Sequence, residues 1–303
     1  MGIIAQIPDG LLHHVAHQRR HPISLYGRSL AGVASSWHEA LDAIDKFNLA
    51  FIWAEDDSSL PLAVAAYRDL LFALYEHLDA TYGVVRALVP AGGSKDSLLD
   101  TQFLDRNKIP GWDGFRTRIR GYVQNRLGAV VNSLKHNGSE IASVYLHSES
   151  DVRAGYYIRD VQSSGALGPS VRVHSDGSSG FTFARDLMLH YWNFYFVSAE
   201  LEALLRRLAP LQFHPLYQND SLSSTYELLA ERMSAIPLAF FPDELRMPCP
   251  LIRWNAADGE LSMEFPSAVR PRRLAASYEV RSTFVVDGKH LTNKLPYLGK
   301  SAP

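Results

Sequence analysis

The sequence predicts an α+β fold: mainly a helical bundle, with an inserted small antiparallel β region and a C-terminal β-hairpin subdomain. Apolar residues recur at helical spacing over long stretches, whereas shorter runs at about 140–182 have the character of strands. Asp287-Gly288 lies between two further strand-like runs and is typical of a hairpin turn. We therefore expect three regions, namely 1–35 of uncertain structure, 36–210 as a helical domain that contains the β insertion, and 211–303 as a C-terminal α/β subdomain.

The helical spacing predicts five helices. The first begins at Ser36, which can form a capping box with Glu39, because Pro22 and Gly27 interrupt the helix-like spacing before it. Pro61 suits the first turn of the second helix. The others are expected at about 113–136, at 183–208, and after a second capping box at 224–227.

Strands are expected where short apolar runs are bounded by turn residues. In the inserted region they are 141–147, 155–161 and 171–174, and near the C-terminus they are 251–254, 261–265, 278–286 and 290–295.

Composition excludes several classes of protein. The 303 residues are 47% hydrophobic and 20% charged, which is typical of a globular protein and not of a disordered or collagen-like chain. A formal net charge of −2 argues against a broadly cationic nucleic-acid binder, although it allows a small basic patch. Cys249 is the single cysteine, so an intramolecular disulfide and a cysteine-built zinc site are excluded. Without a signal-peptide pattern or a long apolar run, we expect a cytoplasmic protein with no membrane association.

Three histidines near the N-terminus form a possible metal site. His13, His17 and His21 are spaced i, i+4, i+8, so on a helix they share one face, and imidazoles one turn apart can hold a metal ion. Pro22 disfavours a helical conformation at His21, and the two arginines before His21 would repel a cation. We therefore favour a polar surface over a metal site and expect no cofactor.

Several basic residues lie within the predicted helix at 113–136. Arg116 and Arg120 share a face of that helix, and Lys135 and His136 lie in its last turn. Such side chains could contact the phosphates of RNA. Solvated cations opposite an apolar stripe explain the same pattern without a ligand, and we favour that explanation.

The start of the predicted helix at 183–208 contains Arg185, Asp186 and His190. A guanidinium holds phosphate oxygens in a bidentate manner, and an imidazole titrates near neutral pH. The segment Arg-Asp-Leu-Met-Leu-His resembles the R-x(4–6)-H motif of HEPN-type ribonucleases, which are small helical bundles that commonly dimerise and cut RNA without metal. The resemblance implies that Arg185 contacts the scissile phosphate and that His190 activates or orients the ribose 2′-hydroxyl. It further implies that Asp186 orients a catalytic partner.

A structural explanation of the same residues stays open. Asp186 and His190 are an i, i+4 pair that can stabilise the start of a helix. On an ideal helix, Arg185 and His190 point about 140° apart. The consecutive aromatic residues at 190–196 favour core or dimer packing over base stacking.

Two classes of function follow from the sequence. One is an RNA-cleaving or RNA-binding protein of HEPN-like kind, in which Arg185 and His190 must face a common cleft. The other is a non-enzymatic helical scaffold or protein-interaction module. The partners expected are accordingly RNA, another protein, or a second copy of the chain.

Overall fold

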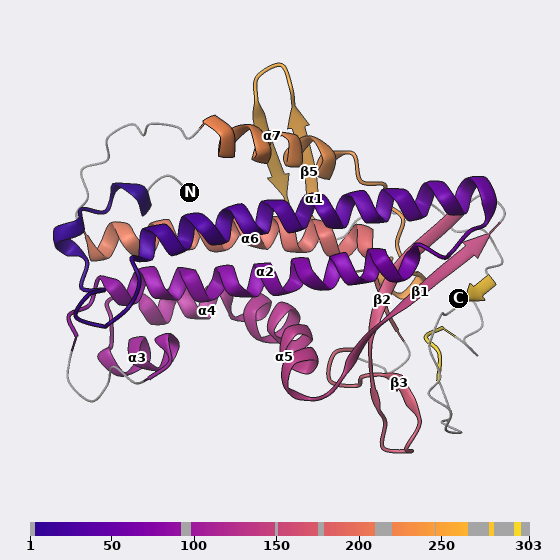
Figure 1. Cartoon of the computed structure of the whole chain (residues 1–303), viewed down its shortest axis with the longest axis horizontal. Coiled ribbons are helices and arrows are strands. Elements are labelled where there is room, and N and C mark those ends of the chain that lie inside the picture. Colours follow the sequence, from indigo (N-terminus) through magenta and orange to yellow (C-terminus); the bar gives the residue numbers. More distant parts are fainter. Residues whose placement is uncertain are drawn as a thin grey trace.

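Two long helices, α1 (Pro22–Ala54) and α2 (Leu60–Ala87), lie side by side along the long axis of the molecule (Figure 1). The computed structural model describes residues 4–91, 98–148, 151–174, 179–209, 220–245, 247–265, 279–281 and 294–297. Helices dominate this part of the chain and the strands form small antiparallel sheets, so the prediction of a mainly helical α+β fold is confirmed. The division into three domains stays a prediction.

The start of α1 differs from the prediction. Pro22 begins the helix instead of preventing it, because the first position of a helix does not use its backbone N–H. Gly27 is exposed within α1 and does not interrupt it. Ser36 therefore lies inside the helix, and Glu39 accepts a hydrogen bond from the hydroxyl of Ser35 at 2.8 Å. The predicted capping box at Ser36 is wrong.

The helix predicted at 113–136 is interrupted by a π-helical turn. Helix α4 (Trp112–Tyr122) runs into the π turn (Val123–Leu127), which continues as α5 (Gly128–His136). The N–H of Gly128 donates to the carbonyl of Val123, five residues earlier. A Cβ atom on Gly128 would lie 2.0 Å from that carbonyl oxygen, so this turn requires glycine.

The remaining helices follow the pattern only in part. Helix α6 (Phe183–Leu208) has the predicted bounds, whereas the short α3 (Asp100–Asn107) was not predicted. Helix α7 (Asp220–Ser234) begins before the second capping box, so Ser224 lies inside it and that prediction is wrong. Short helical turns occur at Ile4–Gln6, Asp9–Leu11 and Pro242–Glu244.

The inserted β region is a sheet built on one hairpin. Strand β1 (Glu140–Ser148) pairs antiparallel with β2 (Asp151–Val161). The other edge of β2 pairs with β3 (Leu167–Pro169) and β4 (Phe181–Thr182), and β1 also pairs with β7 (Glu279–Arg281). The predicted strand at 171–174 is wrong: these residues form a turn, in which the N–H of His174 donates to the carbonyl of Ser170 at 2.8 Å.

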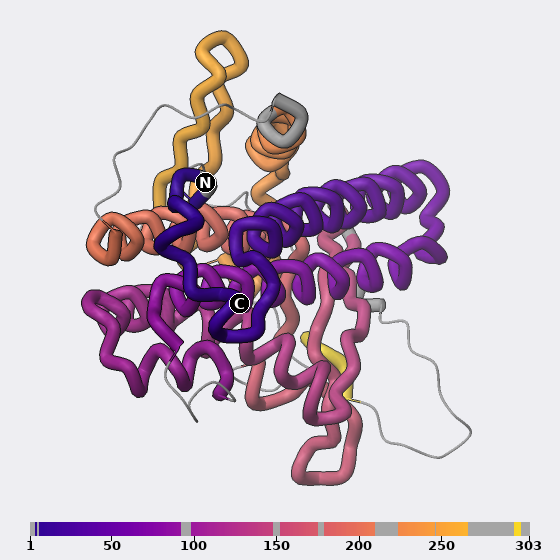
Figure 2. The backbone as a smooth tube through the Cα atoms, turned by 60° about the vertical axis from the view of Figure 1, so that its left-hand side comes forward, coloured from indigo at the N-terminus to yellow at the C-terminus, as the bar shows by residue number. Residues whose placement is uncertain are grey.

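A second, two-stranded sheet pairs β5 (Leu251–Asn255) with β6 (Glu260–Glu264). Figure 2 shows this hairpin beside α7, on one side of α1 and α6. The strands expected at 251–254 and 261–265 are thus present. The Asp287-Gly288 turn lies outside the described residues.

One apolar core joins the helices to the larger sheet. Trp37 of α1 packs edge-on against Tyr191 of α6, and Tyr67 of α2 contacts Tyr156 of β2. All four side chains are buried, so α1, α2, α6 and the β1–β2 hairpin share their packing. Among the described helices, none is long and apolar enough to span a bilayer.

Candidate functional site

The predicted catalytic residues lie in the first two turns of α6. Thr182 caps this helix, and its hydroxyl oxygen accepts a hydrogen bond from the N–H of Arg185 at 3.4 Å. Arg185, Asp186 and His190 are respectively 6%, 0% and 1% exposed. An RNA backbone therefore has little access to any of the three.

Arg185 binds the chain segment that leads into β5. Its Nη2 donates to the carbonyl of Pro248 at 2.8 Å, and its Nη1 lies 3.6 Å from a carboxylate oxygen of Glu244. Glu244 also accepts hydrogen bonds from the hydroxyl of Thr182 at 2.6 Å and from the N–H of Phe241 at 3.3 Å. Burial raises the pKa of Glu244 to about 7, and the hydrogen bonds from Thr182 and the charges of Arg185 and Arg126 limit the rise. Arg185 thus ties α6 to the C-terminal part of the protein.

Asp186 is the centre of a buried polar cluster. One carboxylate oxygen accepts hydrogen bonds from the hydroxyls of Tyr67 at 2.8 Å and Tyr156 at 2.6 Å. The other accepts from Nε of Arg126 at 2.9 Å. Burial by itself would raise the pKa of Asp186, but Arg126 and His190 hold it well below its ordinary value. Asp186 is therefore ionised and fully engaged by the protein.

His190 completes this cluster. Its Nε2 lies 3.3 Å from Asp186, and its Nδ1 is 3.0 Å from the hydroxyl of Tyr122. We call these six residues the Asp186 cluster: Tyr67, Tyr122, Arg126, Tyr156, Asp186 and His190. Arg185 and His190 are thus bound to different groups of neighbours, and the structure does not bring them together at one open cleft.

The predicted phosphate-binding residues also have separate neighbours. Arg116 forms an ion pair with Asp105, and Nε of Arg120 donates to Gln124 at 2.8 Å. The ammonium of Lys135 lies over the rings of two aromatic residues of α2, at 5.2 and 5.4 Å from their centroids, and His136 is exposed at the end of α5. These contacts favour a solvated helix face over a shared phosphate site.

The three N-terminal histidines do not share a helix face, because residues 14–18 form turns and α1 begins only at Pro22. The backbone N–H of His13 donates to the carbonyl of Ala87 at 2.6 Å. His17 Nε2 is 2.7 Å from the carbonyl of Val89, and His21 Nε2 is 3.2 Å from Asp9. Within the described ranges, no group of three or more potential ligands is placed to hold a metal ion.

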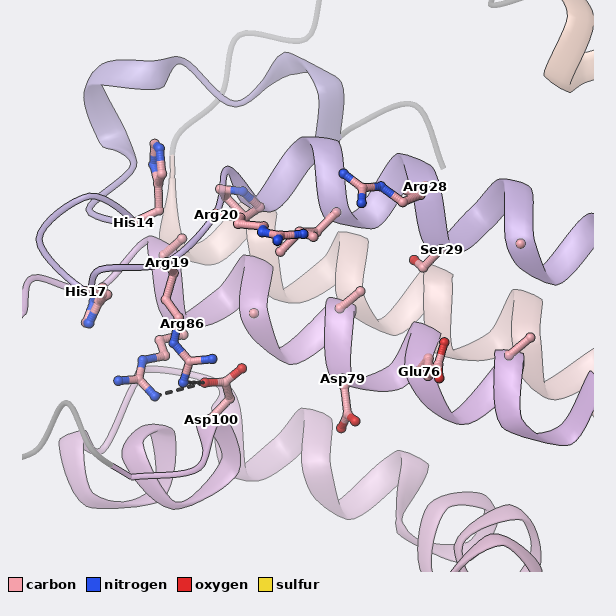
Figure 3. A pocket seen from close by; sticks show the side chains of 17 residues that line it. His14, His17, Arg19, Arg20, Arg28, Ser29, Glu76, Asp79, Arg86 and Asp100 are labelled. Atoms are coloured by element: carbon pink, nitrogen blue, oxygen red, sulfur yellow. Dashed lines mark hydrogen bonds and ion pairs between the residues drawn. The ribbon is translucent and has the colours of Figure 1, made fainter. Parts of the chain in front are cut away.

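A cavity that the sequence did not predict lies between α1 and α2 (Figure 3). Its volume is about 510 Å³. On α2 it is lined by Ala73, Ala80, Gly83 and Ala87, which recur at intervals that place them on one helix face. Small side chains leave a hollow where longer ones would fill the space between the helices. This stripe of small residues was the signal in the sequence.

Charged side chains surround that small-residue floor. Asp100 pairs with Arg19 at 3.2 Å and with the buried Arg86 at 2.9 Å. Arg20 and Arg28 approach from the α1 side, whereas Glu76 and Asp79 belong to α2 (Figure 3). Within the described part of the chain, none of these last four forms an ion pair. We call this cavity and its rim the charged groove.

On the acidic side of the charged groove, the surroundings of Asp79 raise its pKa. Desolvation raises the pKa of Asp79, the carboxylates of Asp100 and Glu76 raise it further, and Lys135 offsets part of the effect. A cation bound there would relieve this repulsion.

Comparison with protein-family models, with curated proteins and with solved structures finds no match to the chain. By its fold and its site, the chain is a mainly helical α+β protein with a charged groove between α1 and α2.

Proposed function

We propose that the protein is a non-enzymatic binding module and that the charged groove is its binding site. The observation that carries this proposal is the combination of an apolar floor with charged side chains that have no ion-pair partner in the described chain. Sites for small molecules combine an apolar lining with a few convergent polar groups and have volumes of about 300–1,000 Å³. The groove has each of these properties.

The second class of function, RNA cleavage, receives less support from the same geometry. It needs a guanidinium and an imidazole that both reach the substrate. Arg185 and His190 are buried and are bound to different parts of the protein. The HEPN-like resemblance stays a prediction.

Titration with 8-anilinonaphthalene-1-sulfonate tests the proposal. This probe joins an apolar ring system to an anion, so it suits a floor of small residues beside Arg20 and Arg28. Ala80→Leu fills the groove, and we expect it to weaken binding at least about fivefold. Ala66→Leu is the matched control, because Ala66 is also half-buried on α2 but does not line the groove. Equal affinity in the two variants would refute the groove as the binding site.

A further inference from the structure

We infer that the charged groove takes a linear zwitterion that carries a carboxylate and an ammonium group joined by an apolar chain. This inference rests on the proposed function and names the chemical class of its ligand.

The distribution of charge is the first argument. The cations Arg20 and Arg28 lie on the α1 side, and the anions Glu76 and Asp79 lie on the α2 side (Figure 3). All four residues are exposed, and no ion pair within 4.0 Å joins the two sides in the described residues. The hollow between the helices keeps them apart, so a ligand that crosses it can pair with both.

The balance of charge is the second argument. Four arginines and three carboxylates line the groove. A ligand with only a negative charge is attracted by Arg20 and Arg28 but repelled by Glu76 and Asp79. A ligand with only a positive charge is attracted by the two carboxylates and repelled by the two arginines. A molecule with one charge of each sign gains from both sides.

The dimensions are the third argument. The cavity has a volume of about 510 Å³, which is in the range of sites for small molecules. An extended eight-carbon chain with C–C bonds of about 1.5 Å spans about 9 Å and fits within such a volume. Its methylenes would lie on Ala80 and Gly83, which are one helical turn apart and whose short side chains leave room for them.

Isothermal titration of the full chain with three probes tests the inference. We expect 8-aminooctanoate to bind about three- to fivefold more tightly than either octanoate or octylamine, because each single-charge probe lacks one exposed ionic contact.

Two variants assign the contacts. Arg28→Gln should abolish the advantage over octylamine, and Glu76→Gln should abolish the advantage over octanoate. Arg120→Gln is the control, because Arg120 is exposed on α4 outside the groove, and it should leave all three affinities unchanged.

Octanoate or octylamine binding as tightly as the zwitterion would overturn the inference, even if Ala80→Leu still weakens binding of the naphthalene sulfonate. If Ala80→Leu does not weaken binding of the naphthalene sulfonate, the groove is not the binding site, and the inference about the zwitterion fails as well. The two failures are therefore distinguishable.

Discussion

The Asp186 cluster and the charged groove both gather arginines and carboxylates, but they differ in how those charges are satisfied. In the cluster, Asp186 receives hydrogen bonds from Arg126, Tyr67 and Tyr156 and is completely buried. In the groove, Arg28 and Glu76 face the same hollow without an ion pair in the described chain. Charges bonded within the protein stabilise its fold, whereas charges left without a partner beside a cavity are available to a ligand.

The largest effect should come from breaking the cluster. Asp186→Asn leaves Arg126 without its counter-ion, and we expect a loss of about 3–5 kcal/mol in the free energy of unfolding. Urea denaturation measures this loss. Glu260→Gln is the control, since Glu260 is exposed on β6, and it should change stability by less than about 0.5 kcal/mol. A loss below about 1 kcal/mol for Asp186→Asn would mean that the cluster is not a stabilising unit.

Glu244 and Asp186 should affect the free energy of unfolding in different pH ranges. The pKa of Glu244 is raised from 4.5 to about 7 in the folded protein, so the folded state holds its proton more tightly than the unfolded state does. The free energy of unfolding should therefore fall by about 2 kcal/mol as pH rises from 5 to 8, relative to Glu244→Gln. Asp186, whose pKa is lowered, loses its contribution only below about pH 4.

The comparison with Glu244→Gln is necessary because His77 acts in the opposite direction. Burial lowers the pKa of His77 to about 4, so its contribution to stability is lost as pH falls from 6.5. That contribution is common to both proteins and cancels in their difference. Parallel stability curves for wild type and variant would contradict the raised pKa of Glu244.

A smaller effect tests the π turn that places Arg126 in the cluster. Gly128→Ala puts a methyl group against the carbonyl of Val123, and we expect a loss of about 1–2 kcal/mol in thermal unfolding. Gly121→Ala is the matched control: nothing lies within 4 Å of its added Cβ, so it should stabilise α4 by about 0.5–1 kcal/mol. Stabilisation by both substitutions would indicate a regular α-helix at this position.

The local sequence pattern predicts helices and strands better than it predicts functional sites. Apolar periodicity identifies α6 and the β1–β2 hairpin, because each depends on residues close together in the chain. The start of α1 was missed because a proline can either begin or interrupt a helix, and neighbouring residues do not decide between the two.

The sites depend on distant contacts. Asp186 meets Tyr67 across 119 positions and Arg126 across 60, so spacing within the segment 185–190 could not show that its charge is satisfied internally. The charged groove likewise requires the packing of α1 against α2. Only its stripe of small residues was visible beforehand.

One titration tests most directly whether the groove, and not the cluster, is the binding site. The naphthalene sulfonate probe is added to Ala80→Leu and to His190→Gln, each at a temperature where circular dichroism shows it to be folded. We expect Ala80→Leu to weaken binding at least about fivefold and His190→Gln to leave it unchanged. Loss of binding in His190→Gln with retention in Ala80→Leu would contradict the account.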